Sequence, residues 1–208
     1  MQIGNDEYLL TTHVSERRRD LWLERRVVFY GERRRDQLRV AIKLRFEEVP
    51  WVDRFGGLGE RFSDQETECL ERCETVEGLP KLLASGFHIQ TDDFENPGGR
   101  IRALVMTRVP GVPVTEIQDL KTHEILNIKN GVIKVLEDTR LQGFAFGEGL
   151  PEKILYDRKT GKVSLVSLAY TEKVDPVEYG PITESRVIVQ EYGLGLWKGS
   201  IDDKHEVN

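Results

Sequence analysis

The sequence predicts an α+β fold in two lobes: a small antiparallel-sheet lobe with one helix, then a truncated, mainly helical lobe. An alternating run from Leu38 to Phe46 indicates a strand, and a long helical pattern at 119–141 occupies the second half. Between them, Val109-Pro110-Gly111-Val112-Pro113 is too proline-rich for a regular element. We therefore place the lobe boundary there, with 1–108 in the first lobe and 109–208 in the second, and expect one compact unit.

Two strand-like runs, 27–30 and 38–46, are joined by a polar turn that begins at Gly31. In the second run, the aliphatic and aromatic residues share one face: Leu38, Val40, Ile42, Leu44 and Phe46. Lys43 therefore points to the opposite face of the sheet, together with Arg39, Ala41 and Arg45.

A helix is predicted from Ser63 to about residue 74 or 76. Ser63 and Glu66 match a capping box, and Gly78-Leu79-Pro80 ends the helix. Strands are then predicted at 82–89 and 101–107, with a hairpin turn at 96–99. This completes the first lobe.

The second lobe begins with the helix at 119–141, which Gly143 is expected to stop. A hairpin of 153–156 and 162–168 follows, turning through 157–161. A last helix is predicted over 182–197, although Gly193 and Gly195 interrupt it.

Composition narrows the function classes. Hydrophobic residues make up 38% of 208 residues, enough for a core, and 36 acidic against 30 basic residues give a net charge of -6. This balance gives no case for nucleic acid or an anionic membrane as partner. Arginines crowd the first third, but acidic residues are interleaved with them, which favours a solvated, salt-bridged face.

Cys69 and Cys73 are the two cysteines, and their spacing suits neither a redox pair nor a zinc site, so we expect them to pack as small apolar groups. The first residues lack a signal-peptide pattern, and no apolar run approaches the ~18 residues of a membrane span. A soluble cytoplasmic protein is therefore expected.

Four segments occur in the order found in protein kinases. They are Val40-Ala41-Ile42-Lys43, the hinge-like run 104–111, the catalytic-loop frame 143–157 and the metal-strand frame 162–169. Over about residues 26–192 the chain resembles the protein kinase-like fold, and most of all the small, shortened kinase-like proteins frequent in fungi. Because 39 residues follow Ala169, we expect a truncated second lobe.

The resemblance implies roles for several residues. Lys43 would contact nucleotide phosphates and be held by Glu66. The alternative is that Glu66 only completes the capping box with Ser63, and that Glu68 supplies the partner or none does. Met106 would guard the back of the pocket and 107–109 would offer main-chain contacts, unless this run is simply an apolar connecting strand.

The departures from the kinase pattern are more decisive. Phe146-Gly147-Glu148 stands where relatives carry His-x-Asp, and Lys153 replaces the metal-binding asparagine. Ser167, Leu168 and Ala169 replace the metal-binding Asp-Phe-Gly segment, and no GxGxxG loop precedes Lys43. Magnesium is held by carboxylate and other oxygen ligands, so we expect these changes to abolish phosphotransfer.

Two functions remain as hypotheses. The first is a pseudokinase-like protein whose inter-lobe cleft binds a small organic ligand or a protein partner. The alternative is a metal-free cyclase, isomerase or lyase acting on an apolar metabolite in that cleft. No cofactor or metal is expected, and Glu148 could act as a base. The candidate catalytic residues are Lys43, Glu66 and Glu148, and the candidate ligand-binding residues are Met106, Thr107, Val109, Phe144, Phe146, Lys153, Ser167 and Leu168.

Overall fold

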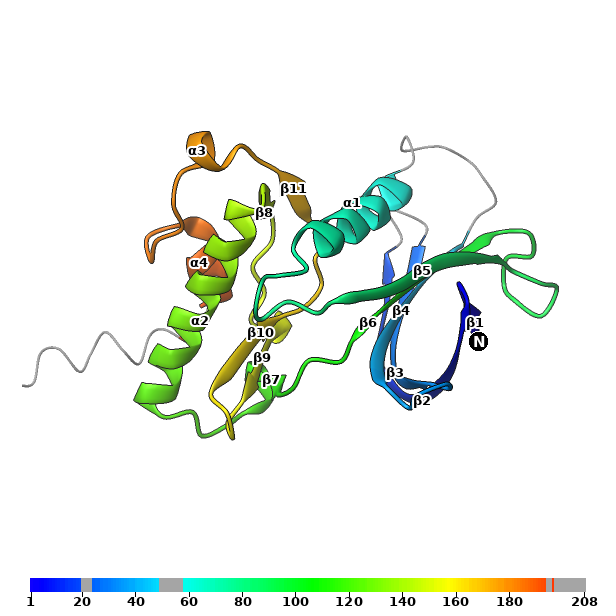
Figure 1. Cartoon of the computed structure of the whole chain (residues 1–208), viewed down its shortest axis with the longest axis horizontal. Coiled ribbons are helices and arrows are strands. Elements are labelled where there is room, and N and C mark those ends of the chain that lie inside the picture. Colours follow the sequence, from blue (N-terminus) through cyan, green and yellow to red (C-terminus); the bar gives the residue numbers. More distant parts are fainter. Residues whose placement is uncertain (20–23, 49–57, 194–195, 197–208) are drawn as a thin grey trace, which may run out of the picture. The chain divides into compact units, whose positions relative to one another are not determined.

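The computed structural model describes residues 1–19, 24–48, 58–193 and 196, and its antiparallel sheets and helices form an α+β architecture (Figure 1). The chain divides into two units. Unit 1 comprises Met1–Thr67 and Lys81–Arg108, and unit 2 comprises Glu68–Pro80 and Val109–Asn208. The α+β class predicted from the sequence is confirmed.

Unit 1 contains a six-stranded antiparallel sheet in the order β1-β2-β3-β4-β6-β5. Its strands are β1 (Gln2–Ile3), β2 (Asp6–Arg19), β3 (Glu24–Arg33), β4 (Arg39–Glu47), β5 (Leu82–Ile89) and β6 (Arg100–Thr107). The predicted alternation in β4 is confirmed, because Val40, Ile42, Leu44 and Phe46 all lie in the buried core of this unit. The two strands β1 and β2 were not predicted.

The sheet of unit 1 curls, so that β1 at one edge approaches β5 at the other edge (Figure 1). His88 Nε2 on β5 lies 2.7 Å from the main-chain oxygen of Gln2. Ile3 and Tyr8 lie in the core that this curl encloses. The concave face of the sheet is therefore apolar, and the charged side chains of β4 point to the other face.

Helix α1 (Leu58–Arg72) begins five residues before the predicted start at Ser63. Ser63 therefore lies inside the helix, where its main-chain oxygen accepts a hydrogen bond from Thr67 Oγ1 at 2.9 Å. The predicted capping box is wrong. Asp64 reaches Arg102 on β6 at 3.2 Å, so the first part of α1 lies against the charged face of the unit 1 sheet.

Unit 2 is built around α2 (Thr122–Leu141), which buries Ile128, Val132, Val135 and Leu136. Glu124 accepts a hydrogen bond from the Lys121 amide at 3.0 Å, which fixes the helix start after 121 instead of at 119. The segment 68–80 belongs to this unit, since Gly78 O accepts the Leu165 amide at 2.8 Å. Cys69 and Cys73 are buried there as thiols, with their Sγ atoms 3.9 Å apart.

Two small sheets and several short helices complete unit 2. The first sheet has the order β10-β9-β7 and the second pairs β11 with β8. The remaining bounds are β7 (Val112–Pro113), η2 (Val114–Glu116), β8 (Phe144–Phe146), η3 (Pro151–Lys153), β9 (Ile154–Asp157), β10 (Lys162–Leu165), β11 (Thr171–Lys173), α3 (Pro176–Tyr179) and α4 (Val187–Tyr192).

The last predicted helix is shorter than expected. Arg186 has an extended backbone and precedes α4, while Gly193 follows its last residue, so the helix covers 187–192 instead of 182–197. Trp197, at the predicted end, lies outside the described residues.

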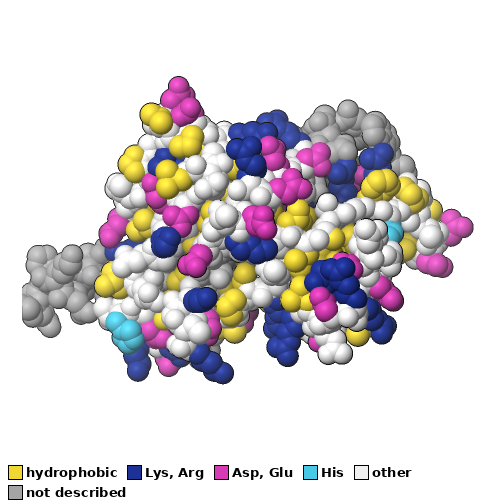
Figure 2. All heavy atoms as spheres, in the orientation of Figure 1, with side chains coloured by type: hydrophobic (Ala, Val, Ile, Leu, Met, Phe, Trp, Pro, Cys, Tyr) yellow, Lys and Arg dark blue, Asp and Glu magenta, His cyan; other side chains and the backbone are white. Residues whose placement is uncertain are grey.

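On the face shown in Figure 2, basic and acidic side chains are interspersed over the described surface. Arg18, for example, contacts both Glu48 and Glu95 at 2.6 Å. The predicted salt-bridged face is confirmed for this arginine. Arg26 is also salt-bridged, to Glu24, but it is buried in unit 1, so the predicted solvation is wrong for this arginine.

Candidate functional site

In unit 1 the lysine singled out by the sequence pairs with Glu66. Lys43 lies in the middle of β4, opposite Val28 on β3 and Leu104 on β6. Its Nζ atom donates to Glu66 Oε1 at 2.8 Å and to Oε2 at 2.6 Å. Their side chains are only 8% and 1% exposed, so this is a buried ion pair between β4 and α1.

Glu66, and not Glu68, is the partner of Lys43. Glu68 Oε1 instead contacts Lys173 Nζ at 2.7 Å, within unit 2. The two glutamates are two residues apart on a helix and point in different directions, which explains why only one reaches the sheet.

Glu66 has a second cationic partner, which the sequence analysis did not identify. Arg45 Nη2 donates to Glu66 Oε2 at 2.6 Å, and Arg45 Nη1 lies 3.4 Å from Glu24 Oε1. Glu24 in turn accepts a hydrogen bond from Arg26 Nε. The signal was available, because Arg45 is two residues after Lys43 and shares its face of the strand.

This buried charge network comprises five residues, each at most 8% exposed: Glu24, Arg26, Lys43, Arg45 and Glu66. It lies within a row of arginines, since Arg17, Arg26, Arg45 and Arg102 stand opposite one another on successive strands. Like charges directly opposite each other destabilise a sheet. The carboxylates of Glu24, Asp64 and Glu66 offset that repulsion through the contacts described above.

Burial and the neighbouring charges shift the pKa values of both Lys43 and Glu66. Burial lowers the pKa of the Lys43 ammonium to about 8, although Glu66 opposes the shift, and the positive charge of Arg45 lowers it further. Burial alone would raise the pKa of the Glu66 carboxyl, but Lys43 and Arg45 outweigh it and lower this pKa to about 2. The Glu66 carboxyl therefore stays ionised at neutral pH, whereas the Lys43 ammonium can lose its proton in mildly basic solution.

The hinge-like residues of unit 1 take part in the sheet. Met106 is buried on β6 opposite Ala41. The Thr107 amide donates to Lys81 O at 2.9 Å, and Thr107 Oγ1 accepts the Lys81 amide at 2.9 Å. The polar groups of Thr107 are thus used within unit 1. Val109, which is half-buried, begins the second part of unit 2.

In unit 2, Glu148 and Lys153 pair with each other. Lys153 Nζ donates to Glu148 Oε2 at 2.5 Å, across the loop between β8 and β9. The ammonium also lies 5.6 Å from the ring centroid of Tyr170, within the range of a cation–π interaction. Lys153 is buried, so its charge is compensated by a carboxylate and an aromatic face.

The same loop is anchored to α4. The Gly149 amide donates to Glu191 Oε2 at 3.1 Å. A Cβ atom on Gly149 would lie 2.8 Å from Ile188 O and 3.0 Å from the Tyr192 amide nitrogen. Only glycine fits this approach without a shift, and the loop containing Glu148 is therefore held closely against the helix.

The apolar candidates of unit 2 are packed in its interior. Phe144, Phe146 and Leu168 are buried, and Phe146 makes an edge contact with the Tyr192 ring at 6.4 Å between centroids. Ser167 is half-buried and adopts a left-handed backbone with φ of 73°. Such a backbone is uncommon for a non-glycine residue, and aspartate and asparagine adopt it more readily than most.

The structure thus brings the candidate residues together in two groups, Lys43 with Glu66 in unit 1 and Glu148 with Lys153 in unit 2. Among the described residues, no three His, Cys, Asp or Glu side chains are grouped as a metal ion would need.

Comparison of the chain with protein-family models and with curated proteins finds no match. In the part of the chain that the structure describes, no helix is long and apolar enough to cross a membrane.

Proposed function

We propose that this protein has a protein kinase-like two-lobed fold and binds a small organic ligand without transferring phosphate. The order of its elements supports this proposal. Three long strands, β2 to β4, precede α1; two more strands lead to the proline-rich segment, and a helix and a hairpin follow. This is the order on which the resemblance to kinases rests, with Lys43 on the third of these strands and Glu66 on the helix.

The Glu148–Lys153 pair is the observation that supports the second part of the proposal, that the protein does not transfer phosphate. In the kinase alignment, Glu148 takes the place of the aspartate that accepts the substrate proton, and Lys153 that of the asparagine that binds magnesium. Here the two side chains bond to each other at 2.5 Å. An ammonium cannot ligate a metal ion and repels it, while Ser167 lacks the carboxylate that its kinase counterpart supplies. The residues at these three positions therefore disfavour phosphoryl transfer, and ligand binding is the role that we propose in its place.

The first test restores the kinase residues. In the wild type, ATP with magnesium should give no magnesium-dependent increase in melting temperature and no phosphotransfer. The double variant Lys153→Asn, Ser167→Asp should gain a magnesium-dependent stabilisation by ATP, because both metal-binding positions are refilled. Ser167→Asp suits the left-handed backbone at that position.

A matched control carries the same two changes at exposed positions of unit 2, Lys159→Asn and Ser185→Asp, and should respond like the wild type. A wild type stabilised by ATP only with magnesium would overturn the proposal that metal-dependent chemistry is lost. Failure of the restored variant to respond, when it is folded, would count against the kinase alignment itself. A screen that found only a protein partner would replace the small ligand in the proposal.

A second candidate function is metal-free acid–base catalysis, of the cyclase, isomerase or lyase type. The observation that favours it is the buried contact of Lys43 Nζ with Glu66 Oε2 at 2.6 Å, and burial lowers the pKa of Lys43 to about 8 beside a carboxylate whose pKa is about 2. Paired groups with separated pKa values can divide acid and base roles near neutral pH.

This candidate is tested by incubating the chain with a panel of apolar metabolites and detecting isomeric or ring-closed products by mass spectrometry. Activity should fall at least about a hundredfold in Lys43→Met, the usual contribution of a general acid or base, and stay unchanged in Lys159→Met. Product formation that persists in Lys43→Met would exclude Lys43 as the acid or base.

A further inference from the structure

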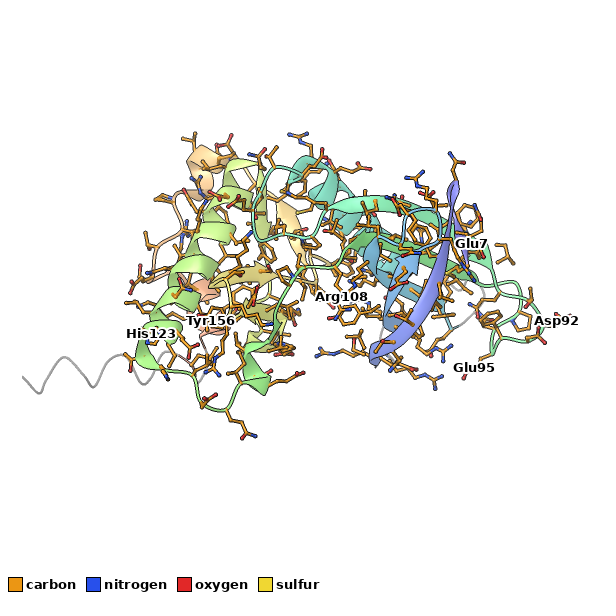
Figure 3. The ribbon with its side chains drawn as sticks, turned by 60° about the horizontal axis from the view of Figure 1, so that its bottom comes forward. Glu7, Asp92, Glu95, Arg108, His123 and Tyr156 are labelled. Atoms are coloured by element: carbon orange, nitrogen blue, oxygen red, sulfur yellow. The ribbon has the colours of Figure 1, made fainter. Side chains whose placement is uncertain are left out.

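The outer edge of β2 is open over most of its length. β1 pairs only with Asp6 and Glu7, and Met1 exchanges main-chain hydrogen bonds with Tyr8 at 2.8 and 2.9 Å. From Leu9 to Arg19, β2 pairs with β3 on one side, and no described residue pairs with the other side. Figure 3 shows this strand, with Glu7 labelled, along the edge of the unit 1 sheet.

This open edge has the composition of a pairing strand. Residues 11–18 are exposed on both faces of the strand, and Leu9 and Val14 expose 43% and 42% of their surface. The stretch Leu9–Ser15 contains no glycine, proline, lysine, arginine or carboxylate. Exposed edges with these properties pair readily with another strand, and native proteins usually protect them with charges or bulges.

The protective features of β2 are unevenly placed. Bulges against β3 occur near Thr11 and Val14, but the charged residues Glu16, Arg17 and Arg18 gather at the end of the strand. The middle of the open edge therefore has no charged residue to oppose pairing.

The open edge can pair with a second copy of itself, and the arrangement of charges favours the antiparallel direction for that pairing. The open edge runs from residue 9 to residue 19, so its midpoint is Val14. Antiparallel pairing about Val14 places Arg17 and Arg18 of one copy opposite Thr11 and Leu10 of the other. Parallel pairing in register would place arginine opposite arginine, which is unfavourable. Antiparallel pairing also uses the whole open edge and stops before the part that β1 covers.

We propose that the open edge of β2 is a homodimer interface, in which β2 of a second copy pairs with it antiparallel about Val14. This inference is independent of the proposed function, because it uses a strand edge that contains none of the candidate site residues. The result is a two-fold symmetric contact that joins the two unit 1 sheets into one continuous sheet.

The test introduces a charge of either sign at Val14 and measures the dimer dissociation constant by sedimentation equilibrium of the full chain over a range of concentrations. The wild type should form dimers. Val14→Lys and Val14→Glu should each weaken the dimer at least about tenfold, because like charges then meet at the two-fold axis. An equimolar mixture of the two variants should recover dimers, since lysine then faces glutamate.

The control is Val177→Lys, the same change at a valine on α3 that is 89% exposed, and it should dimerise like the wild type. Circular dichroism confirms that each variant is folded. A wild type that stays monomeric up to about 100 μM, a dimer indifferent to Val14→Lys, or a mixture that fails to recover would each overturn the proposal.

Discussion

Glu66 is the residue on which the buried charges of unit 1 converge. It is 1% exposed and accepts hydrogen bonds from both Lys43 and Arg45. Glu66→Gln should lower the free energy of unfolding by about 3–5 kcal/mol, because two buried cations then lose their shared counter-charge. Urea denaturation at pH 7 measures the change. Glu95→Gln removes an exposed carboxylate that pairs with Arg18 and should cost at most about 1 kcal/mol. Equal losses in the two variants would contradict the importance of the buried network.

Lys43 gives unit 1 a dependence on basic pH. Its pKa is lowered from 10.5 to about 8 in the folded chain, so between these values the unfolded chain binds the additional proton. Folding stability due to this group therefore rises as the pH rises from 8 to 10.5, and falls as the pH is lowered. The unfolding free energy of the wild type, relative to Lys43→Met, should increase by up to about 3 kcal/mol across that range. A difference that does not vary with pH would show that burial leaves the Lys43 ammonium unperturbed.

At the scale of elements, the loop that carries Glu148 is fixed by its approach to α4. Gly149→Ala should lower stability by about 1–3 kcal/mol, because the new Cβ meets main-chain atoms of Ile188 and Tyr192 that cannot move aside. The hydrogen exchange of the Gly149 amide, which Glu191 protects, should accelerate. Gly86→Ala is the control, since its Cβ would meet only Ile3 Cγ2 at an ordinary 3.5 Å. An amide that exchanges as slowly in Gly149→Ala as in the wild type would show that the loop does not depend on this contact.

Elements with a clear period could be predicted from the sequence, and elements defined by distant partners could not. β4 follows its alternation, and β5 matches the predicted 82–89 in full. β2 could not be predicted because its residues 11–18 are exposed on both faces, so the sequence shows no alternation of buried and exposed residues there. The predicted start of α1 was wrong because Ser63 and Glu66 have the spacing of a capping box. In the structure, Glu66 instead accepts a hydrogen bond from Lys43 on β4.

The contacts of the candidate site could likewise be predicted only in part from the sequence. The Lys43–Glu66 pair could be proposed from motif spacing, since the kinase resemblance names both positions. Arg45 could have been added from its shared strand face, but Glu24 could not, because only the β3–β4 register brings it to Arg45. The pairing of Glu148 with Lys153 depends on the conformation of the loop, which residue types alone do not determine.

At the scale of the whole molecule, the two units cannot be separated by one cut after Arg108. The segment Glu68–Pro80 precedes that point in the chain but belongs to unit 2, and it contributes buried Cys69, Leu70 and Cys73. A fragment of residues 1–108 should therefore expose both thiols and react with a thiol reagent at the rate of the urea-unfolded chain. In the intact chain the reaction should be at least about a hundredfold slower, as protection by folding stability requires. Protected cysteines in the fragment would mean that this segment packs equally well without unit 2.

The two ion pairs of Glu66 limit how this protein could respond to a ligand. With Lys43 and Arg45 both bonded to Glu66, releasing the first part of α1 from the sheet breaks two buried ion pairs. If that release costs about 3 kcal/mol, fewer than about 1% of molecules occupy the released state at any moment. A ligand acting by displacing this helix would have to bind the released state more than about a hundredfold better than the held one. A ligand without such a preference would leave α1 in place and would have to be sensed through another element.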